Sequence, residues 1–211
     1  ASSGVSPKKA EFEEMLFTNV IGTSKLIKVA AKSKIDRIII AGTCHEYGKL
    51  NTYKPIKVDT QLNPISIYGA TKAASYCLSV ALCKKYNLKM FYGRIFSAYG
   101  EGQFEENFWP SLQKAALDGS DFSMTSGQQI RDFINVELVI ENLLKGCTRE
   151  DLKKGYIHVK NIGSGKKMKL IDFAKSEWKR LGAKGVLIPG DIPTRINEPK
   201  YFVPDLREEI F

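Results

Sequence analysis

Short apolar runs alternate along this chain with longer segments whose apolar residues recur at helical spacing. Such runs, rich in β-branched and aromatic residues and bounded by polar ones, are typical of buried parallel strands. The alternation of helix and strand predicts an α/β fold. The expected strands are 37–42, 89–96, 130–136 and 156–162, and the expected helices are 8–33, the Ala-rich run after Pro64, 108–117, 137–146 and 170–181.

The length and composition fit a globular protein with one core or one domain and a smaller appendage, at 211 residues and 43% hydrophobic content. No apolar run approaches the roughly 20 residues of a membrane helix, and the first residues lack the apolar stretch of a signal peptide. We therefore expect a cytoplasmic protein that does not enter a membrane. The four cysteines are scattered without CxxC spacing, which indicates reduced thiols.

The chain is basic, with a net charge of +9, and this charge favours an anionic partner. Nucleic acid, an acidic surface and a phosphorylated small molecule are the classes that qualify. The lysines occur as separated doublets at expected helix ends or turns, where solvated cations are common. We therefore expect no nucleic-acid binding. The doublets are 8–9, 84–85, 153–154 and 166–167.

Tyr68 and Lys72 are four residues apart in the Ala-rich run, so a helix places them on one face. A nearby cation lowers the pKa of a phenol, and such a pair can act as a general acid or base. Both residue types are common, so a helix that carries them by chance fits equally well.

The segment 43–48 follows the expected strand 37–42, at the end of the sheet where open α/β folds bind ligands.

Two other patterns are weaker. Cys44, His45 and His158 lack the spacing of metal ligands, so we expect no metal site and interpret Cys44 as a small packing residue. The run Gly163 to Lys167 resembles the tail of a phosphate-binding loop, but the glycine required at position 160 or 161 is absent.

Several segments occur in a fixed order: NVIGT at 19–23, GTCHEYG at 42–48, YGATK at 68–72, RIF at 94–96 with YGEG at 99–102, and more weakly RDFINV at 131–136 and NIGSG at 161–165. Together they resemble the extended short-chain dehydrogenase/reductase family, in its nucleotide-sugar epimerase, reductase and dehydratase branch. The resemblance implies a Rossmann-like, doubly wound parallel sheet with a small C-terminal substrate-binding region. It implies that 1–97 and 130–163 belong to the dinucleotide-binding domain, and 98–129 and 164–211 to the substrate-binding region.

One departure concerns the beginning of the chain. The family opens with a strand, a Gly-rich turn and a helix that bind the dinucleotide pyrophosphate, and nothing here corresponds. We therefore expect only the later strands of the sheet, in a fragment that lacks about the first third of such a protein; a half-protein that works with a partner is the alternative. The choice between NAD and NADP lies in the absent part.

The resemblance also implies roles for individual residues. Thr43, Tyr68 and Lys72 would be catalytic, with Thr43 bonded to the reacting oxygen and Lys72 also holding the nicotinamide ribose. The remaining implied residues fall into two groups. Asn19 and Phe96 would join Tyr68 and Lys72 at the NAD or NADP cofactor, and Ser97, Asn107, Arg131, Arg195 and Glu198 would join Thr43 at the nucleotide-sugar. A homodimer is expected.

The reaction type depends on the two residues after Thr43. Dehydratases of the family carry an Asp-Glu pair there, which removes water from the sugar, and this chain has Cys44 and His45 instead. A thiol is a poor acid for a leaving hydroxyl, and Glu46 comes one position too late. We therefore expect a 4-epimerase or a 4-ketosugar reductase. A 4,6-dehydratase that uses His45, and a catalytically silent relative, remain as alternatives.

Overall fold

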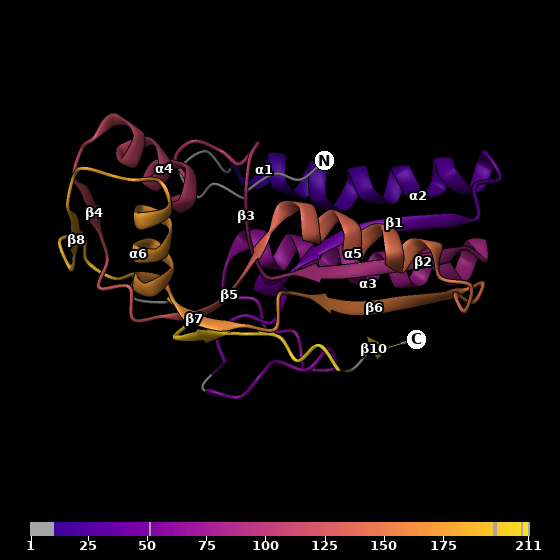
Figure 1. Cartoon of the computed structure of the whole chain (residues 1–211). Coiled ribbons are helices and arrows are strands. Elements are labelled where there is room, and N and C mark those ends of the chain that lie inside the picture. The colour runs from indigo at the N-terminus through magenta and orange to yellow at the C-terminus, as the bar shows by residue number, and fades with distance from the viewer. Residues whose placement is uncertain (1–10, 51, 196–197, 208, 211) are drawn as a thin grey trace.

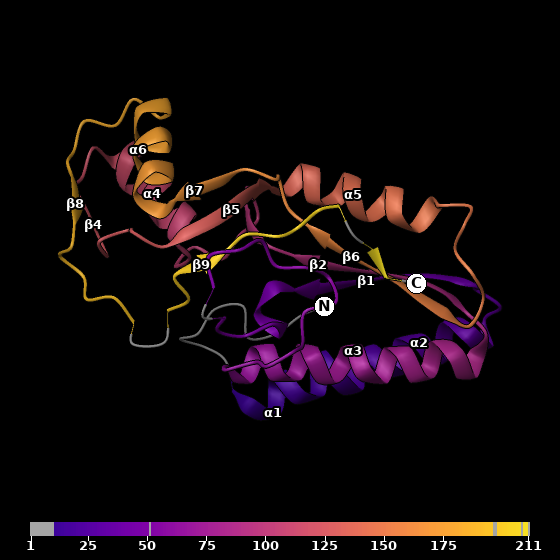
Figure 2. The same ribbon diagram turned by 90° about the horizontal axis from the view of Figure 1, so that it is seen from below.

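The central sheet of the computed structural model has the strand order β1-β2-β6-β10. Its first three strands run parallel, and β10 is antiparallel to β6. Helices cover both faces, with α5 on one side and α2 and α3 on the other (Figure 2). The structure describes residues 11–50, 52–195, 198–207 and 209–210. The bounds are β1 Arg37–Thr43, β2 Lys89–Ile95, β6 Tyr156–Ile162, β10 Glu209–Ile210, α2 Thr23–Lys32, α3 Ile67–Tyr86 and α5 Val136–Thr148.

Burial of β2 on both faces explains its nearly continuous apolar sequence. Met90, Phe91 and Tyr92 are fully buried, because α3 covers one face of the sheet and α5 the other. Gly146 lets α5 approach the sheet closely, since a Cβ atom there would lie 2.2 Å from the Phe91 ring. The predicted strand at 89–96 is confirmed, ending one residue earlier.

The N-terminal helix is continuous but changes its winding. It begins as α1 (Phe12–Met15), becomes π-helical over Leu16–Gly22 and continues as α2. The predicted helix over 8–33 is confirmed from residue 12, whereas 8–10 lie outside the described residues and the π-helical segment was not predicted. Such segments in α-helices are frequent at functional sites.

Helix α3 starts with a side-chain cap, in which Ser66 Oγ accepts a hydrogen bond from the Gly69 N–H over 3.1 Å. It ends at Asn87, which adopts the left-handed conformation with φ 51°. Gly69 lies against the turn after β1, because a Cβ atom there would come within 2.5 Å of the His45 carbonyl oxygen. The glycine after Tyr68 therefore allows the start of α3 to contact the end of β1.

A second lobe lies beyond the carboxyl ends of the parallel strands, on the left of Figure 1. It packs helices α4 and α6 around a small apolar cluster that includes Leu112 and Ile171. Strands β3, β5, β7 and β9 form one sheet between the lobe and the central sheet, and β4 pairs with β8. The bounds are β3 Ser97–Tyr99, α4 Phe108–Asp118, β4 Phe122–Met124, β5 Ile130–Asn135, β7 Lys167–Lys169, α6 Leu170–Arg180, β8 Leu187–Pro189 and β9 Tyr201–Phe202.

The α/β class and the parallel sheet predicted from the sequence are confirmed. The predicted helices at 108–117, 137–146 and 170–181 correspond to α4, α5 and α6 within one or two residues at each end. The division into a dinucleotide-binding domain and a substrate-binding region stays a prediction. Two sets of strand pairings cross its boundary: β10 pairs with β6 of the central sheet, and β5 pairs with β7 and β9.

Candidate active site

The turn after β1 is held by its own side chains. Thr43 caps the short 3-10 helix Cys44–Glu46, because its Oγ1 accepts a hydrogen bond from the His45 N–H over 3.3 Å. In return, the Thr43 N–H donates to Glu46 Oε1 over 2.8 Å. This reciprocal capping fixes Thr43 at the carboxyl end of β1.

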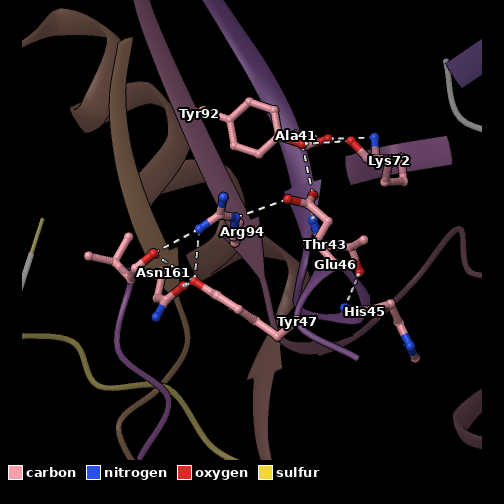
Figure 3. A network of polar contacts seen from close by, with 10 residues as sticks. Ala41, Thr43, His45, Glu46, Tyr47, Lys72, Tyr92, Arg94 and Asn161 are labelled. Carbon is pink, nitrogen blue, oxygen red and sulfur yellow. Dashed lines mark hydrogen bonds and ion pairs between the residues drawn. The ribbon is translucent and has the colours of Figure 1, made fainter. Parts of the chain in front are cut away.

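Lys72 reaches from α3 to the strand that carries Thr43. Its Nζ donates to the Ala41 carbonyl oxygen over 2.6 Å, two residues before Thr43 (Figure 3). The side chain is buried, and burial lowers the pKa of Lys72, whereas the Glu46 carboxylate acts in the opposite direction. The structure thus brings the predicted residues Lys72 and Thr43 to the same end of β1.

Tyr68 lies one helical turn before Lys72 and is half-buried. Its ring lies edge-on to the His45 ring, with 5.9 Å between the centroids. Because His45 follows Thr43 in the turn, this contact brings Tyr68 to the same end of the sheet. The three residues predicted as catalytic therefore gather at one site.

Asn19 contacts helix α3, which carries Tyr68 and Lys72. It is buried in the π-helical segment, and its Nδ2 donates to Thr71 Oγ1 over 3.0 Å. The Thr71 hydroxyl in turn donates to the Tyr68 carbonyl oxygen over 3.0 Å. The contact of Asn19 with the cofactor stays a prediction. In the structure, its side chain ties the π-helical segment to α3 through Thr71.

Phe96 follows β2 and packs in an apolar cluster beneath the turn, together with Cys44, Tyr47, Ile56 and Phe202. Its side chain is buried, so the ring supports the turn from within the core. The role of Phe96 at the cofactor stays a prediction.

Several residues predicted to bind substrate meet in the second lobe. Ser97, Arg131 and Glu198 line a cleft of about 210 Å³ that also has aromatic walls, among them Tyr99 and Phe133. Arg131 forms an ion pair with Glu198 and lies 5.7 Å from the centre of the Phe202 ring. Burial lowers the pKa of Arg131, and Glu198 opposes this effect.

Two predicted substrate residues lie at the edge of this arrangement. Asn107 stands at the N-terminus of α4, and its side chain does not cap the helix. Arg195 is exposed, and its carbonyl oxygen accepts a hydrogen bond from the Glu198 N–H over 3.0 Å. The side chain of Glu198 forms an ion pair with Arg131. A more open depression of about 440 Å³ on α4 has none of the predicted site residues in its lining.

The two residues after Thr43 differ in their protonation chemistry. Burial raises the pKa of the Cys44 thiol to about 12, which keeps it protonated, and its packing agrees with the interpretation as a small core residue. His45 is an exposed residue, yet burial of its imidazole lowers its pKa, the Arg131 charge acts in the same direction, and Glu198 opposes them. Within the described part of the chain, no three His, Cys, Asp or Glu side chains are grouped so that they could hold a metal ion.

The loop 163–165 binds a carboxylate of the chain itself. The backbone N–H groups of Ser164 and Gly165 donate to the Asp132 carboxylate over 2.6 and 2.7 Å. These donors are thus used within the protein, which agrees with the sequence argument against a phosphate-binding loop. Asp132 is fully buried and joins this loop to β5.

Sequence reasoning missed a buried polar network behind the turn, shown in Figure 3. Arg94 Nε donates to Glu46 Oε2 over 2.9 Å, and the two side chains are 3% and 0% exposed. Tyr92 donates to Glu46 Oε1 over 2.8 Å, and Arg94 Nη1 donates to the Tyr47 hydroxyl over 3.1 Å. The signal was an arginine within a strand expected to be buried, since such a charge requires a partner.

None of the described helices combines the length and hydrophobicity that crossing a bilayer requires.

The model of the NAD dependent epimerase/dehydratase family matches residues 1–163. A trifunctional UDP-glucose 4,6-dehydratase, epimerase and reductase of Arabidopsis thaliana is 28% identical, over 91% of this chain and 29% of its own length. Human dTDP-D-glucose 4,6-dehydratase is 26% identical, over 77% of this chain and 45% of its own length. The chain thus spans less than half the length of these two relatives.

The solved structure of MoeE5 in complex with UDP-glucuronic acid and NAD is 27% identical and superposes with a TM-score of 0.84, covering 98% of this chain and 68% of MoeE5. The UDP-glucose 4-epimerase of Thermotoga maritima, at 21% identity, shares the fold with a TM-score of 0.86, over 98% of this chain and 67% of that structure. The family model covers most of the chain, and the neighbouring structures share its Rossmann-like architecture. The chain therefore belongs to the NAD dependent epimerase/dehydratase family.

Proposed function

We propose that the protein containing this chain is a nicotinamide-dependent enzyme that acts on a nucleotide-sugar, as a 4-epimerase or a 4-ketosugar reductase. The observation that carries the proposal is the convergence of Thr43, Tyr68 and Lys72 at the carboxyl end of the sheet. Open α/β sheets bind ligands at this edge. The relatives named above include nucleotide-sugar epimerases and dehydratases, which supports the substrate class.

In this proposal, Tyr68 exchanges a proton with the reacting hydroxyl or ketone of the sugar, and Thr43 donates a hydrogen bond to the same oxygen. The positive charge of Lys72 favours the phenolate form of Tyr68 and thereby makes proton transfer possible near neutral pH. A hydrogen bond to the oxygen stabilises the charge that develops on it during the reaction.

The residues present fit a nicotinamide cofactor, NAD or NADP. The Lys72 ammonium has three donors, of which the Ala41 carbonyl oxygen accepts one, so the group has the capacity to hold ribose hydroxyls as well. We propose that Tyr68 and Lys72 hold the ribose, with Asn19 and Phe96 nearby. A bound nicotinamide supplies or accepts hydride at the sugar carbon. MoeE5, the relative solved with UDP-glucuronic acid, also contains NAD.

For the nucleotide-sugar, we propose the cleft of the second lobe that Ser97, Arg131 and Glu198 line. Arg131 is suited to a diphosphate because a guanidinium is a planar, bidentate donor. Ser97, which lines the same cleft, directly follows the buried Phe96 at the end of β2. Asn107 and Arg195 complete the proposed set from the edge of the lobe, and Glu198 orients Arg131 through their ion pair.

The proposed reaction is redox chemistry at one carbon rather than loss of water. Elimination needs an acid for the leaving hydroxyl, and the Cys44 thiol is buried with a pKa of about 12. The test is to incubate the full-length protein with a panel of nucleotide-hexoses and to follow products by mass. Loss of one water from any of them refutes redox at one carbon. A new configuration at constant mass indicates an epimerase, and gain of two hydrogens by a ketosugar indicates a reductase.

The catalytic role of Tyr68 has a direct test. Tyr68→Phe removes only the hydroxyl, so turnover is expected to fall by roughly 10²–10⁴-fold while nucleotide-sugar binding persists. Tyr86→Phe is the matched control, because Tyr86 ends the same helix, and its turnover is expected to equal that of the wild type. Near-normal turnover of Tyr68→Phe at saturating cofactor would refute the role. A catalytically silent relative would show cofactor binding without turnover in the wild type.

We also propose that the protein forms a homodimer. Large apolar side chains are exposed along the N-terminal helix, including Phe12, Phe17, Leu26 and Val29. Burial of these side chains against a second copy would remove them from water. Sedimentation equilibrium of the full-length protein tests the proposal, and a monomer throughout the micromolar range would refute it.

A further inference from the structure

The carboxylate of Glu46 joins the elements that carry the proposed catalytic residues. Its Oε1 accepts hydrogen bonds from the Thr43 N–H and from the Tyr92 hydroxyl, both over 2.8 Å. The Tyr92 hydroxyl also lies 3.4 Å from the Lys72 carbonyl oxygen on α3. One buried oxygen atom therefore connects the turn after β1 with β2, whose Tyr92 reaches α3.

The other oxygen of the same carboxylate is held by Arg94. Arg94 Nε donates to Glu46 Oε2, and Arg94 Nη1 donates to the Val58 carbonyl oxygen over 2.9 Å. The guanidinium lies 4.6 Å from the centre of the Tyr76 ring on α3. With the Thr43 N–H, Tyr92 and Arg94 as donors, the carboxylate is bonded from three directions and its position is fixed.

We propose that Glu46 is a positioning residue of the active site, which fixes the turn of Thr43 against helix α3 and stabilises the positive charge of Lys72. The inference rests on the proposed function, because it assigns Glu46 a task in the chemistry of Tyr68 and Lys72. A buried ammonium needs a nearby negative charge, since burial favours its neutral form. Glu46 supplies that charge. Burial lowers the pKa of Lys72, and the Glu46 carboxylate raises it.

Other titratable groups around Lys72 do not supply a second carboxylate. Glu46 in the turn is the charged group that acts on the Lys72 ammonium, whereas the Tyr92 hydroxyl contacts the carbonyl oxygen of Lys72, and Arg94 lies over the Tyr76 ring on α3. Both tyrosines are neutral when protonated, and Arg94 carries a positive charge. Among these groups, Glu46 is therefore the source of negative charge at neutral pH.

The experiment measures the titration of Lys72 by NMR in the intact protein labelled with ¹³C-lysine, with the resonance assigned through Lys72→Met. Glu46→Gln removes the charge and keeps the shape, so the pKa of Lys72 is expected to fall below the wild-type value. Tyr92→Phe is the matched control, because it removes a hydrogen bond to the same oxygen and keeps the carboxylate, and its Lys72 is expected to titrate as in the wild type.

A fall of the pKa in Glu46→Gln alone supports the proposal. An unchanged Lys72 in Glu46→Gln, or an equal fall in Tyr92→Phe, overturns it. Glu46→Gln leaves Arg94 without its carboxylate partner, and where this variant does not fold, Glu46→Gln/Arg94→Met is compared with Arg94→Met: the two differ only in the Glu46 charge, so the pKa of Lys72 is expected to be lower in the double variant. A wild type without turnover on any nucleotide-sugar would refute the proposed function instead, and it would leave the Lys72 titration interpretable.

Discussion

Replacement of Arg94 by methionine is expected to destabilise the fold strongly, because it leaves the Glu46 carboxylate buried without its cation. The two side chains are 3% and 0% exposed, so water does not replace the lost partner. Breaking a buried pair by removing one member costs about 3–5 kcal/mol. The lost contacts of the guanidinium with Tyr47 and Val58 act in the same direction. We therefore expect the free energy of unfolding of Arg94→Met to fall by about 3–5 kcal/mol.

Urea unfolding followed by circular dichroism measures this change, with two further variants for comparison. Lys145→Met removes the cation of the exposed pair with Glu141, whose side chains are 78% and 57% exposed, and should change stability by less than about 1 kcal/mol. Glu46→Leu/Arg94→Met removes both buried charges and should be more stable than Arg94→Met, because no unpaired charge remains. A loss in Arg94→Met as small as that in Lys145→Met, or a double variant less stable than Arg94→Met, would refute the reasoning.

Three further predictions concern other parts of the chain. Iodoacetamide at pH 8 should modify the exposed Cys77 and spare Cys44 until unfolding, since Cys44 is buried and its thiol protonated; peptide mass mapping checks this. His45 should titrate below 6.5 by NMR, so its contribution to stability is lost as the pH falls below 6.5, and an unshifted titration would contradict the described environment. Gly146→Ala should destabilise by roughly 1–3 kcal/mol, because its Cβ atom would overlap the buried Phe91 ring. Gly22→Ala should not destabilise, because its Cβ atom would make only an ordinary contact, 3.4 Å from the Phe17 carbonyl oxygen; urea unfolding compares the two variants.

The regular elements of the central sheet could be predicted from sequence because their periodicity reflects burial. The run at 89–96 is apolar throughout, as expected for β2 between two helical layers, and the strand forms there. The helix at 108–117 likewise forms as α4, with Trp109, Leu112 and Ala116 buried on one face. These segments are long enough that their apolar pattern does not depend on any single residue.

The short strands of the second lobe could not be predicted in the same way. Strand β7 has three residues, all exposed, and its sequence Lys-Met-Lys carries no apolar pattern. Its pairing with β5 is decided by tertiary contacts of residues distant in sequence. The π-helical segment around Asn19 was missed for a related reason, since its apolar spacing over a few residues does not differ from that of an α-helix.

At the active site, the sequence predicted the residues at the ends of regular elements but not the buried charges behind them. Helical spacing placed Tyr68 and Lys72 on one face and the family resemblance implied a role for Thr43, and the structure brings Lys72 to the strand of Thr43 through Ala41. Glu46 was considered only as a possible acid and set aside because it comes one position too late, whereas the structure shows that it is fully buried. A turn residue becomes buried only when the lobes around it assemble, and single-sequence patterns do not contain that information.

The burial of Glu46 and Arg94 has a consequence for how stability and chemistry are related at this site. A buried ion pair is weak support for stability, because apolar side chains of similar volume often serve as well. If the pair served stability alone, removing both charges in Glu46→Gln/Arg94→Met would have no effect on the Lys72 ammonium. In our proposal, Glu46→Gln/Arg94→Met keeps the fold but loses the negative charge that stabilises the Lys72 ammonium. Comparing Glu46→Gln/Arg94→Met with Arg94→Met, by urea unfolding and by the Lys72 titration, therefore separates the two roles, because only the positioning role predicts a lower pKa of Lys72 when the Glu46 charge is removed.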